Sequence, residues 1–84
     1  MSSRREKIEA MLKDDPQDTF LRYSLAMELR SEGDREASLQ RLGELMRDDP
    51  PYVPAFFMAA QQLAELTRTE EARTMLQEGV QQAE

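Results

Sequence analysis

The residues in this chain best suited to bind a metal ion are two pairs of neighbouring aspartates. They lie in Asp14-Asp15-Pro16 and Asp48-Asp49-Pro50, two copies of one tripeptide that are 34 residues apart. Adjacent carboxylates can hold Mg²⁺ or Ca²⁺. Neighbouring side chains point in different directions, however, and no third or fourth ligand follows either pair at a fixed spacing. Acid–proline sequences are typical of turns, so we interpret both copies as turns that end helices and predict no metal site.

Other chemistry is limited by which residues the chain lacks. Its 84 residues include no cysteine and no histidine, which excludes disulfides, thiolate chemistry and nearly all zinc sites. An enzyme would then need a constellation of carboxylates, Lys or Ser, and the sequence contains no Gly-rich phosphate loop and no nucleophile motif. We therefore expect no catalytic residue, no enzymatic activity and no cofactor.

Charge also limits the class of partner. The chain carries 17 acidic and 11 basic residues, a net charge of −6, and its one local basic cluster is Arg4, Arg5 and Lys7. Phosphate backbones would be repelled overall, so we expect no nucleic-acid partner. No apolar stretch follows the charged N-terminal residues. The sequence thus predicts neither a signal peptide nor a membrane span, and the cytoplasm is the expected location.

The recurring aspartates belong to a repeat that involves most of the chain. Apolar or small residues recur at a shift of 34 without a gap, while the charged residues between them change. The matched sets are Ile8, Leu42 and Leu76; Leu12, Met46 and Val80; Tyr23 and Phe57; Leu25 and Ala59; Ala26 and Ala60; Leu29 and Leu63. A fixed period of this length is typical of stacked helical repeats.

Apolar residues spaced three or four apart, interrupted by turn signals, predict five helices and no strand. The expected helices cover about 3–13, 18–31, 34–46, 54–66 and the region after 67–70. Asp18 is a good N-cap, Gly33 can adopt the left-handed conformation that ends a helix, and Pro54 suits a first helical turn. Thr67 and Glu70 stand at the spacing of a capping box before the last helix.

Small and apolar residues also fall where one known repeat family places them. They are, in the first copy, Leu25, Ala26, Leu29, Gly33, Ser38, Leu42, Leu45 and Pro50 and, in the second, Phe56, Ala59, Ala60, Leu63, Ala72, Leu76, Gly79 and Val80. With these residues the chain resembles a tetratricopeptide repeat (TPR) protein, in which each 34-residue repeat pairs two antiparallel helices, A and B. The resemblance implies an all-α fold whose helix pairs stack as a short right-handed solenoid, in the order B-A-B-A-B. It covers 1–84 as a single domain, with a leading helix over 3–14 and repeats over 19–52 and 53–84.

Two positions depart from the family pattern. Arg22 stands where the second repeat has the aromatic Phe56, and Thr67 replaces the turn glycine that the first repeat keeps as Gly33. If both turns share one geometry, Thr67 is left-handed and strained by about 1 kcal/mol. The sequence therefore predicts that Thr67→Gly raises the melting temperature.

The resemblance further implies a protein-interaction function, because family members bind peptides or partner helices on a concave groove lined by their A helices. The residues carried over to this groove are Phe20, Tyr23, Met27, Arg30, Phe57, Gln61 and Glu65. Aromatic and Met side chains often dominate binding energy at such surfaces, but Tyr23 and Phe57 can equally be covers of a small core, and both interpretations stay open. The basic clamp that some family members use for acidic chaperone tails is absent. We therefore expect a more apolar or basic ligand.

A second hypothesis is self-association. In an array of stacked helices the last helix leaves one face uncovered, and this chain has no further helix to cover it. Leu76, Val80 and Ala83 would form that face. They predict a homodimer through the C-terminal helix as the alternative to peptide binding.

Overall fold

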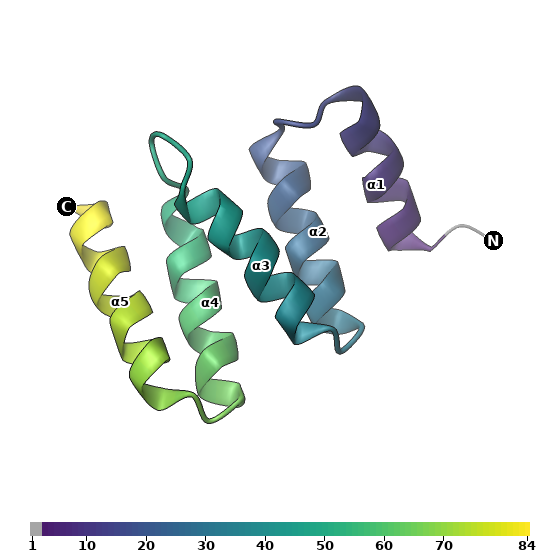
Figure 1. Cartoon of the computed structure of the whole chain (residues 1–84). Helices are drawn as coiled ribbons and strands as arrows, with labels where there is room; N and C mark the ends of the chain where they lie inside the picture. Colours follow the sequence, from purple (N-terminus) through teal and green to yellow (C-terminus); the bar gives the residue numbers. More distant parts are fainter. Residues whose placement is uncertain (1–2) are drawn as a thin grey trace. The chain divides into compact units, whose positions relative to one another are not determined.

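The computed structural model of the chain describes residues 3–84, and within this range it contains five α-helices and no strand (Figure 1). The helices are α1 (Arg4–Asp14), α2 (Thr19–Ser31), α3 (Arg35–Met46), α4 (Val53–Glu65) and α5 (Thr69–Ala83). The all-α prediction is confirmed, and every predicted helix is present with its ends shifted by a few residues at most.

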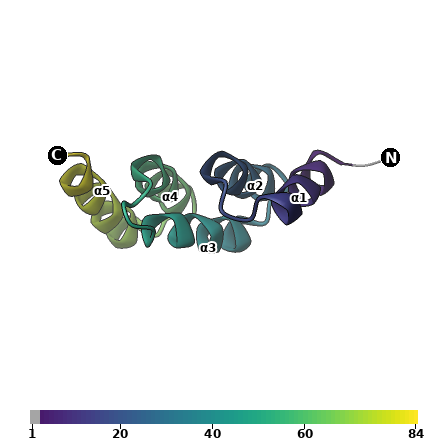
Figure 2. The same cartoon turned by 90° about the horizontal axis from the view of Figure 1, so that it is seen from above.

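The chain divides into two compact units, Met1–Arg41 and Leu42–Glu84, and the boundary falls inside α3. In the first unit α1 packs against α2, and in the second α4 packs against α5. Each of these pairs lies side by side in both views and runs antiparallel (Figure 1 and Figure 2). We describe each unit by itself.

The helix starts follow local chemistry that the sequence predicts. Ser3 and Glu6 form a capping box on α1, in which the Ser3 hydroxyl accepts from the Glu6 amide at 3.1 Å. On α2 the Asp18 carboxylate accepts from the Leu21 amide at 2.9 Å. Pro54 lies in the first turn of α4. Amides in the first turn donate no hydrogen bond within the helix, so the amide proton that proline lacks is not needed there.

The turns that follow α2 and α4 are closed by the same main-chain hydrogen bonds, 34 residues apart. After α2 the amides of Gly33 and Asp34 donate to carbonyls one turn back, at 3.0 Å and 2.9 Å. After α4 the amides of Thr67 and Arg68 do the same at 3.0 Å and 2.8 Å. The acceptor carbonyls belong to Arg30, Leu29, Ala64 and Leu63, respectively. This is the Schellman pattern, which needs a left-handed residue, and φ is 89° at Gly33 and 60° at Thr67. Gly33 thus takes the left-handed conformation that its residue type allows, and Thr67 meets the condition on which the Thr67→Gly prediction depends.

The predicted capping box before α5 is wrong. The N-cap is Arg68, which makes no side-chain cap bond within residues 3–84; its guanidinium instead contacts Glu71 Oε2 at 2.6 Å. The Thr67 hydroxyl donates to the Leu66 carbonyl at 2.6 Å. Because Thr67 supplies the left-handed residue that ends α4, it lies one position too early to cap α5.

The core of the first unit joins three helices. Ile8 of α1 packs with Leu25 and Leu29 of α2, and Leu12 and Ala37 flank them. The Arg4–Glu28 and Arg5–Glu32 ion pairs, at 3.2 Å and 3.0 Å, also link α1 to α2. Because three of these four side chains are well exposed, these pairs add little to stability.

Within the first unit a small polar residue lies where α3 approaches α2. Ser38 is fully buried, and its hydroxyl donates to the Ala26 carbonyl at 2.6 Å. A larger side chain would separate the two helices, and a buried hydroxyl without a partner would cost about 1–3 kcal/mol. The family resemblance expects a small residue at this position, and the structure gives it a specific contact.

The core of the second unit forms where α4 meets α5. The buried face of α4 carries Ala55, Phe56, Ala59, Ala60 and Leu63. On α5 the facing residues are Ala72 and Gly79, and a Cβ placed on Gly79 would lie 2.8 Å from the Phe56 Cβ. Real Cβ atoms essentially never come this close, so the two helices approach over a position that only glycine fits.

Thr67→Gly is expected to raise the free energy of unfolding by about 0.5–1 kcal/mol, because it removes left-handed strain that exceeds the added entropy of glycine in the unfolded chain. For a domain of this size the melting temperature should rise by a few degrees. Thermal denaturation followed by circular dichroism measures it. Gly33→Ala is the matched control and should move stability in the opposite direction, since the same turn then acquires a side chain at φ 89°. A lower melting temperature for Thr67→Gly would contradict the argument.

Candidate functional site

The predicted groove residues of the first unit share one face of α2. Phe20, Tyr23, Met27 and Arg30 are spaced by three, four and three residues, so their side chains lie above one another along the helix. Phe20 is 74% exposed, whereas the other three are half-buried. An aromatic ring with three quarters of its surface in solvent contributes little to a core, which leaves Phe20 available to a partner.

The predicted groove residues of the second unit lie on α4. Gln61 and Glu65 are exposed and sit one and two turns after Phe57, which is 39% exposed. The ring of Phe57 lies against α5, because its Cζ and Cε1 atoms are 3.2 Å and 3.4 Å from the position of a Cβ on Gly79. Phe57 therefore packs the α4–α5 contact. Of the two interpretations left open for this residue, the contact favours core cover.

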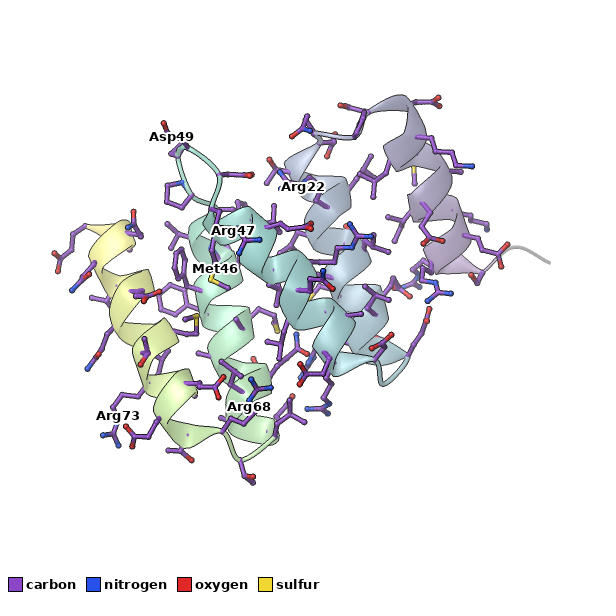
Figure 3. All side chains as sticks on the ribbon, viewed as in Figure 1. Arg22, Met46, Arg47, Asp49, Arg68 and Arg73 are labelled. Carbon is purple, nitrogen blue, oxygen red and sulfur yellow. The ribbon has the colours of Figure 1, made fainter. Side chains whose placement is uncertain are left out.

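The predicted self-association residues form a stripe on α5, which we call the α5 stripe: Leu76, Val80 and Ala83. Leu76 is 47% exposed, Val80 is 51% exposed, and Ala83 is exposed as well. They follow one another at spacings of four and three residues, so they share one face of the helix. Arg73 flanks this face and extends away from the helix (Figure 3). It makes a 3.8 Å contact with the Glu70 carboxylate, and both side chains are largely exposed.

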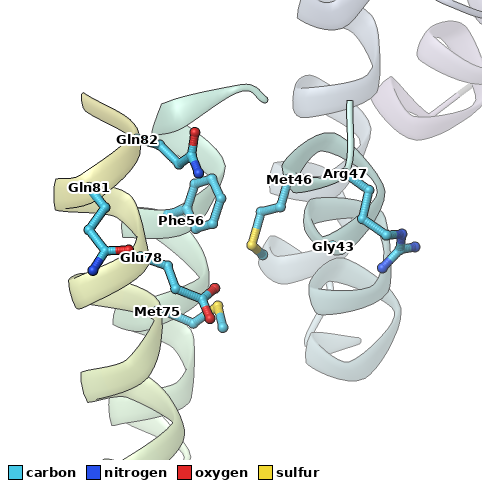
Figure 4. A pocket seen from close by; sticks show the side chains of 8 residues that line it. All are labelled: Gly43, Met46, Arg47, Phe56, Met75, Glu78, Gln81 and Gln82. Atoms are coloured by element: carbon cyan, nitrogen blue, oxygen red, sulfur yellow. The ribbon is translucent and has the colours of Figure 1, made fainter. Parts of the chain in front are cut away.

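A hollow of about 440 Å³ lies within the second unit, between the last turn of α3 and helix α5. Phe56, Met46 and Met75 supply apolar walls (Figure 4). The remaining lining residues are Gly43, Arg47, Glu78, Gln81 and Gln82. Met46 faces the hollow in Figure 4, whereas the guanidinium of Arg47 is turned away from it. The hollow can accept an apolar side chain, and nothing in its lining resembles a catalytic group.

Sequence reasoning missed this hollow. Its apolar walls come from three different helices, so no spacing along the chain connects Met46, Phe56 and Met75. The available signal was the pair of methionines, because flexible thioether side chains often line adaptable surfaces. This signal is weak in a chain with six methionines.

The paired aspartates lie at helix ends. Asp15 is the C-cap of α1; its amide donates to the Met11 carbonyl at 3.1 Å, and its carbonyl accepts from the Asp18 amide at 3.2 Å. The Asp48 amide donates to the Leu45 carbonyl at 3.4 Å after α3. Within residues 3–84 no group of three or more acidic, His or Cys side chains is arranged to hold a metal ion. Both pairs therefore belong to turns.

None of the helices described in residues 3–84 combines the length and the apolar character needed to cross a membrane.

The chain was also compared with known proteins. No protein-family model matches it, and neither the curated proteins nor the solved structures contain a match.

Proposed function

We propose that this chain is a non-catalytic, TPR-like interaction module that binds a peptide or partner helix through the exposed faces of α2 and α4. The observation that carries the proposal is the local repeat. The two helices α2 and α4 have 13 residues each. The first residue of α4 comes 34 residues after the first residue of α2, and the same holds for their last residues. Both helices are closed by the same Schellman hydrogen bonds. Their buried residues Leu25, Ala26 and Leu29 correspond to Ala59, Ala60 and Leu63. Sequence, helix bounds and turn geometry thus agree on one period.

The chemistry of these faces favours an apolar or basic ligand. Phe20 offers an exposed aromatic ring, and Tyr23 and Met27 follow it one and two turns later along the same helix face. On α4, Glu65 is exposed and acidic, and the chain as a whole carries a net charge of −6. An acidic peptide would be repelled, and a basic one would be attracted at low ionic strength. The proposal includes no cofactor, nucleic acid or membrane, and the cytoplasm remains the predicted location.

A peptide array tests the proposal if the net charge and the apolar content of its peptides vary independently of each other. The wild-type chain should bind apolar-basic peptides and should not bind acidic peptides of equal apolar content. Phe20→Ala should weaken the strongest binder about tenfold, which corresponds to about 1.4 kcal/mol. Glu65→Lys should reduce the preference for basic peptides.

Gln40→Ala is the matched control, because Gln40 is exposed on α3 and lies outside the proposed faces. Phe57→Ala is unsuitable as a binding probe, since removing its ring also loosens the contact with Gly79. If Phe20→Ala and Gln40→Ala bind alike, or if acidic peptides bind best, the proposed face is not the site.

A further inference from the structure

The α5 stripe is exposed to solvent, although equivalent residues of the earlier helices are buried. Ile8, Leu42 and Leu76 are equivalent at the 34-residue shift; Ile8 is 6% exposed and Leu42 is 0% exposed, but Leu76 is 47% exposed. The next residue of the stripe follows the same trend, since Met46 is half-buried and its equivalent Val80 is 51% exposed. Leu76 and Val80 thus have the residue type of a buried position and the exposure of a surface position. Such a face suits an apolar partner helix.

Two charges flank the stripe and restrict how a partner helix can lie. Arg73 and Glu84 are 11 residues apart, close to three helical turns. Glu84 is the C-cap residue directly after Ala83, and continuing the helical spacing by this one residue places the two charges along the same edge of the stripe. The cation is in the first half of α5, and the anion directly follows the last residue of the helix. A helix that places an anion beside Arg73 and a cation beside Glu84 would therefore be complementary at both ends.

A second copy of α5 meets this requirement when it runs antiparallel. Leu76 then faces Val80 of the other copy, and Val80 faces Leu76. Residues on the same edge also face each other in an antiparallel pair that is related by a two-fold axis, so Arg73 of each copy meets Glu84 of the other. In a parallel two-fold pair the two edges are exchanged, so Arg73 of one copy and Glu84 of the other lie on opposite edges and at opposite ends of the interface, and no Arg73–Glu84 pair forms.

We propose that two copies of this chain associate through the α5 stripe, with their α5 helices antiparallel and with two reciprocal Arg73–Glu84 ion pairs. The Arg73–Glu70 contact within one helix does not prevent this, because at 3.8 Å between exposed groups it is weak and easily exchanged. The stripe has three apolar residues and is smaller than the roughly 800 Å² per partner of a stable interface. We expect a reversible dimer with a Kd of about 10–1000 µM. The surface is separate from the ligand-binding faces proposed on α2 and α4.

Sedimentation velocity of the purified chain, from micromolar to millimolar concentration, tests the dimer. The average mass should rise with concentration for the wild-type chain. Val80→Glu should raise the Kd at least tenfold, and Gln81→Glu is the matched control. It adds the same charge on α5 at an exposed site off the stripe and should leave the Kd within about twofold. Circular dichroism should be unchanged in both variants, because both positions are exposed.

Charge reversal tests the antiparallel register. Arg73→Glu and Glu84→Arg should each weaken self-association at low salt about two- to fivefold, because each creates two like-charge pairs. A mixture of these two variants should form a heterodimer at least as strong as the wild-type dimer, and so should the chain that carries both changes. If the double variant associates no better than the single ones, the proposed register is wrong.

A wild-type chain that stays monomeric over the whole concentration range would overturn the dimer, as would equal Kd values for Val80→Glu and Gln81→Glu. These failures are distinguishable from failure of the ligand-binding proposal. Val80→Glu should leave binding on the peptide array unchanged, whereas Phe20→Ala should leave sedimentation unchanged.

Discussion

Leu42→Ala is expected to lower the free energy of unfolding by about 2–5 kcal/mol, the usual range for a buried leucine whose removal leaves a cavity. Leu42 is among the largest fully buried side chains described, and it lies in the compact second unit. A domain of this length has a total stability of only about 4–13 kcal/mol. The variant should therefore lose a large fraction of its stability and be partly unfolded under mild conditions.

Leu76→Ala is the matched comparison, because Leu76 occupies the equivalent position of the repeat but is 47% exposed. At concentrations too low for a dimer, Leu76→Ala should lower the free energy of unfolding by less than about 1 kcal/mol, because the substitution removes little buried apolar surface. Urea denaturation of both variants, followed by far-ultraviolet circular dichroism, measures the difference. Equal losses would mean that the α5 stripe is not the uncovered counterpart of Leu42.

Gly79→Ala is expected to lower stability by about 1–3 kcal/mol, although alanine is the better helix former. The new Cβ would lie 2.8 Å from the Phe56 Cβ, which is attached directly to the backbone of α4 and cannot turn away. It would also lie 3.2 Å from the Phe57 ring. Relief therefore requires α4 and α5 to move apart, which reduces the contacts of the small residues between them.

Gly43→Ala provides the control, because it is the same substitution in a helix with space around it. The nearest neighbour of its new Cβ would be the Arg47 Nη1 at 3.5 Å, an ordinary contact with the end of a flexible side chain. The higher helix propensity of alanine should then dominate, and the free energy of unfolding should rise by about 0.5–1 kcal/mol. Thermal melts of both variants give the comparison. A stabilised Gly79→Ala variant would show that α4 and α5 do not approach this closely.

The helices and their ends could be predicted from sequence because their determinants are local. Asp18 caps α2 with its own carboxylate, and Gly33 and Pro54 act through the backbone angles they allow. Such features depend on residues a few positions apart. The left-handed conformation of Thr67 was predictable for a different reason: the repeat assigns it the position of Gly33, although its residue type alone argues against that conformation.

The role of Phe57 and the hollow beside Phe56 could not be predicted in the same way. The repeat pairs Phe57 with Tyr23, but the repeat does not tell whether a ring at this position turns toward a neighbouring helix. That depends on Gly79, 22 residues later, leaving room for the ring. The hollow likewise depends on how far the ends of α3 and α5 diverge. The binding role of Phe20, Tyr23 and Met27 stays a prediction, and their exposure identifies Phe20 as the residue to test first.

The closing turns after α2 and α4 have a consequence for how this chain tolerates sequence change. All the hydrogen bonds that form the Schellman pattern come from main-chain groups, so the turn makes no chemical demand on the side chain at its left-handed position. Glycine at position 33 and threonine at position 67 therefore build one geometry, and the difference between them is stored as torsional strain in a single residue. The 34-residue period is therefore more regular in the backbone geometry of this protein than in its amino-acid sequence.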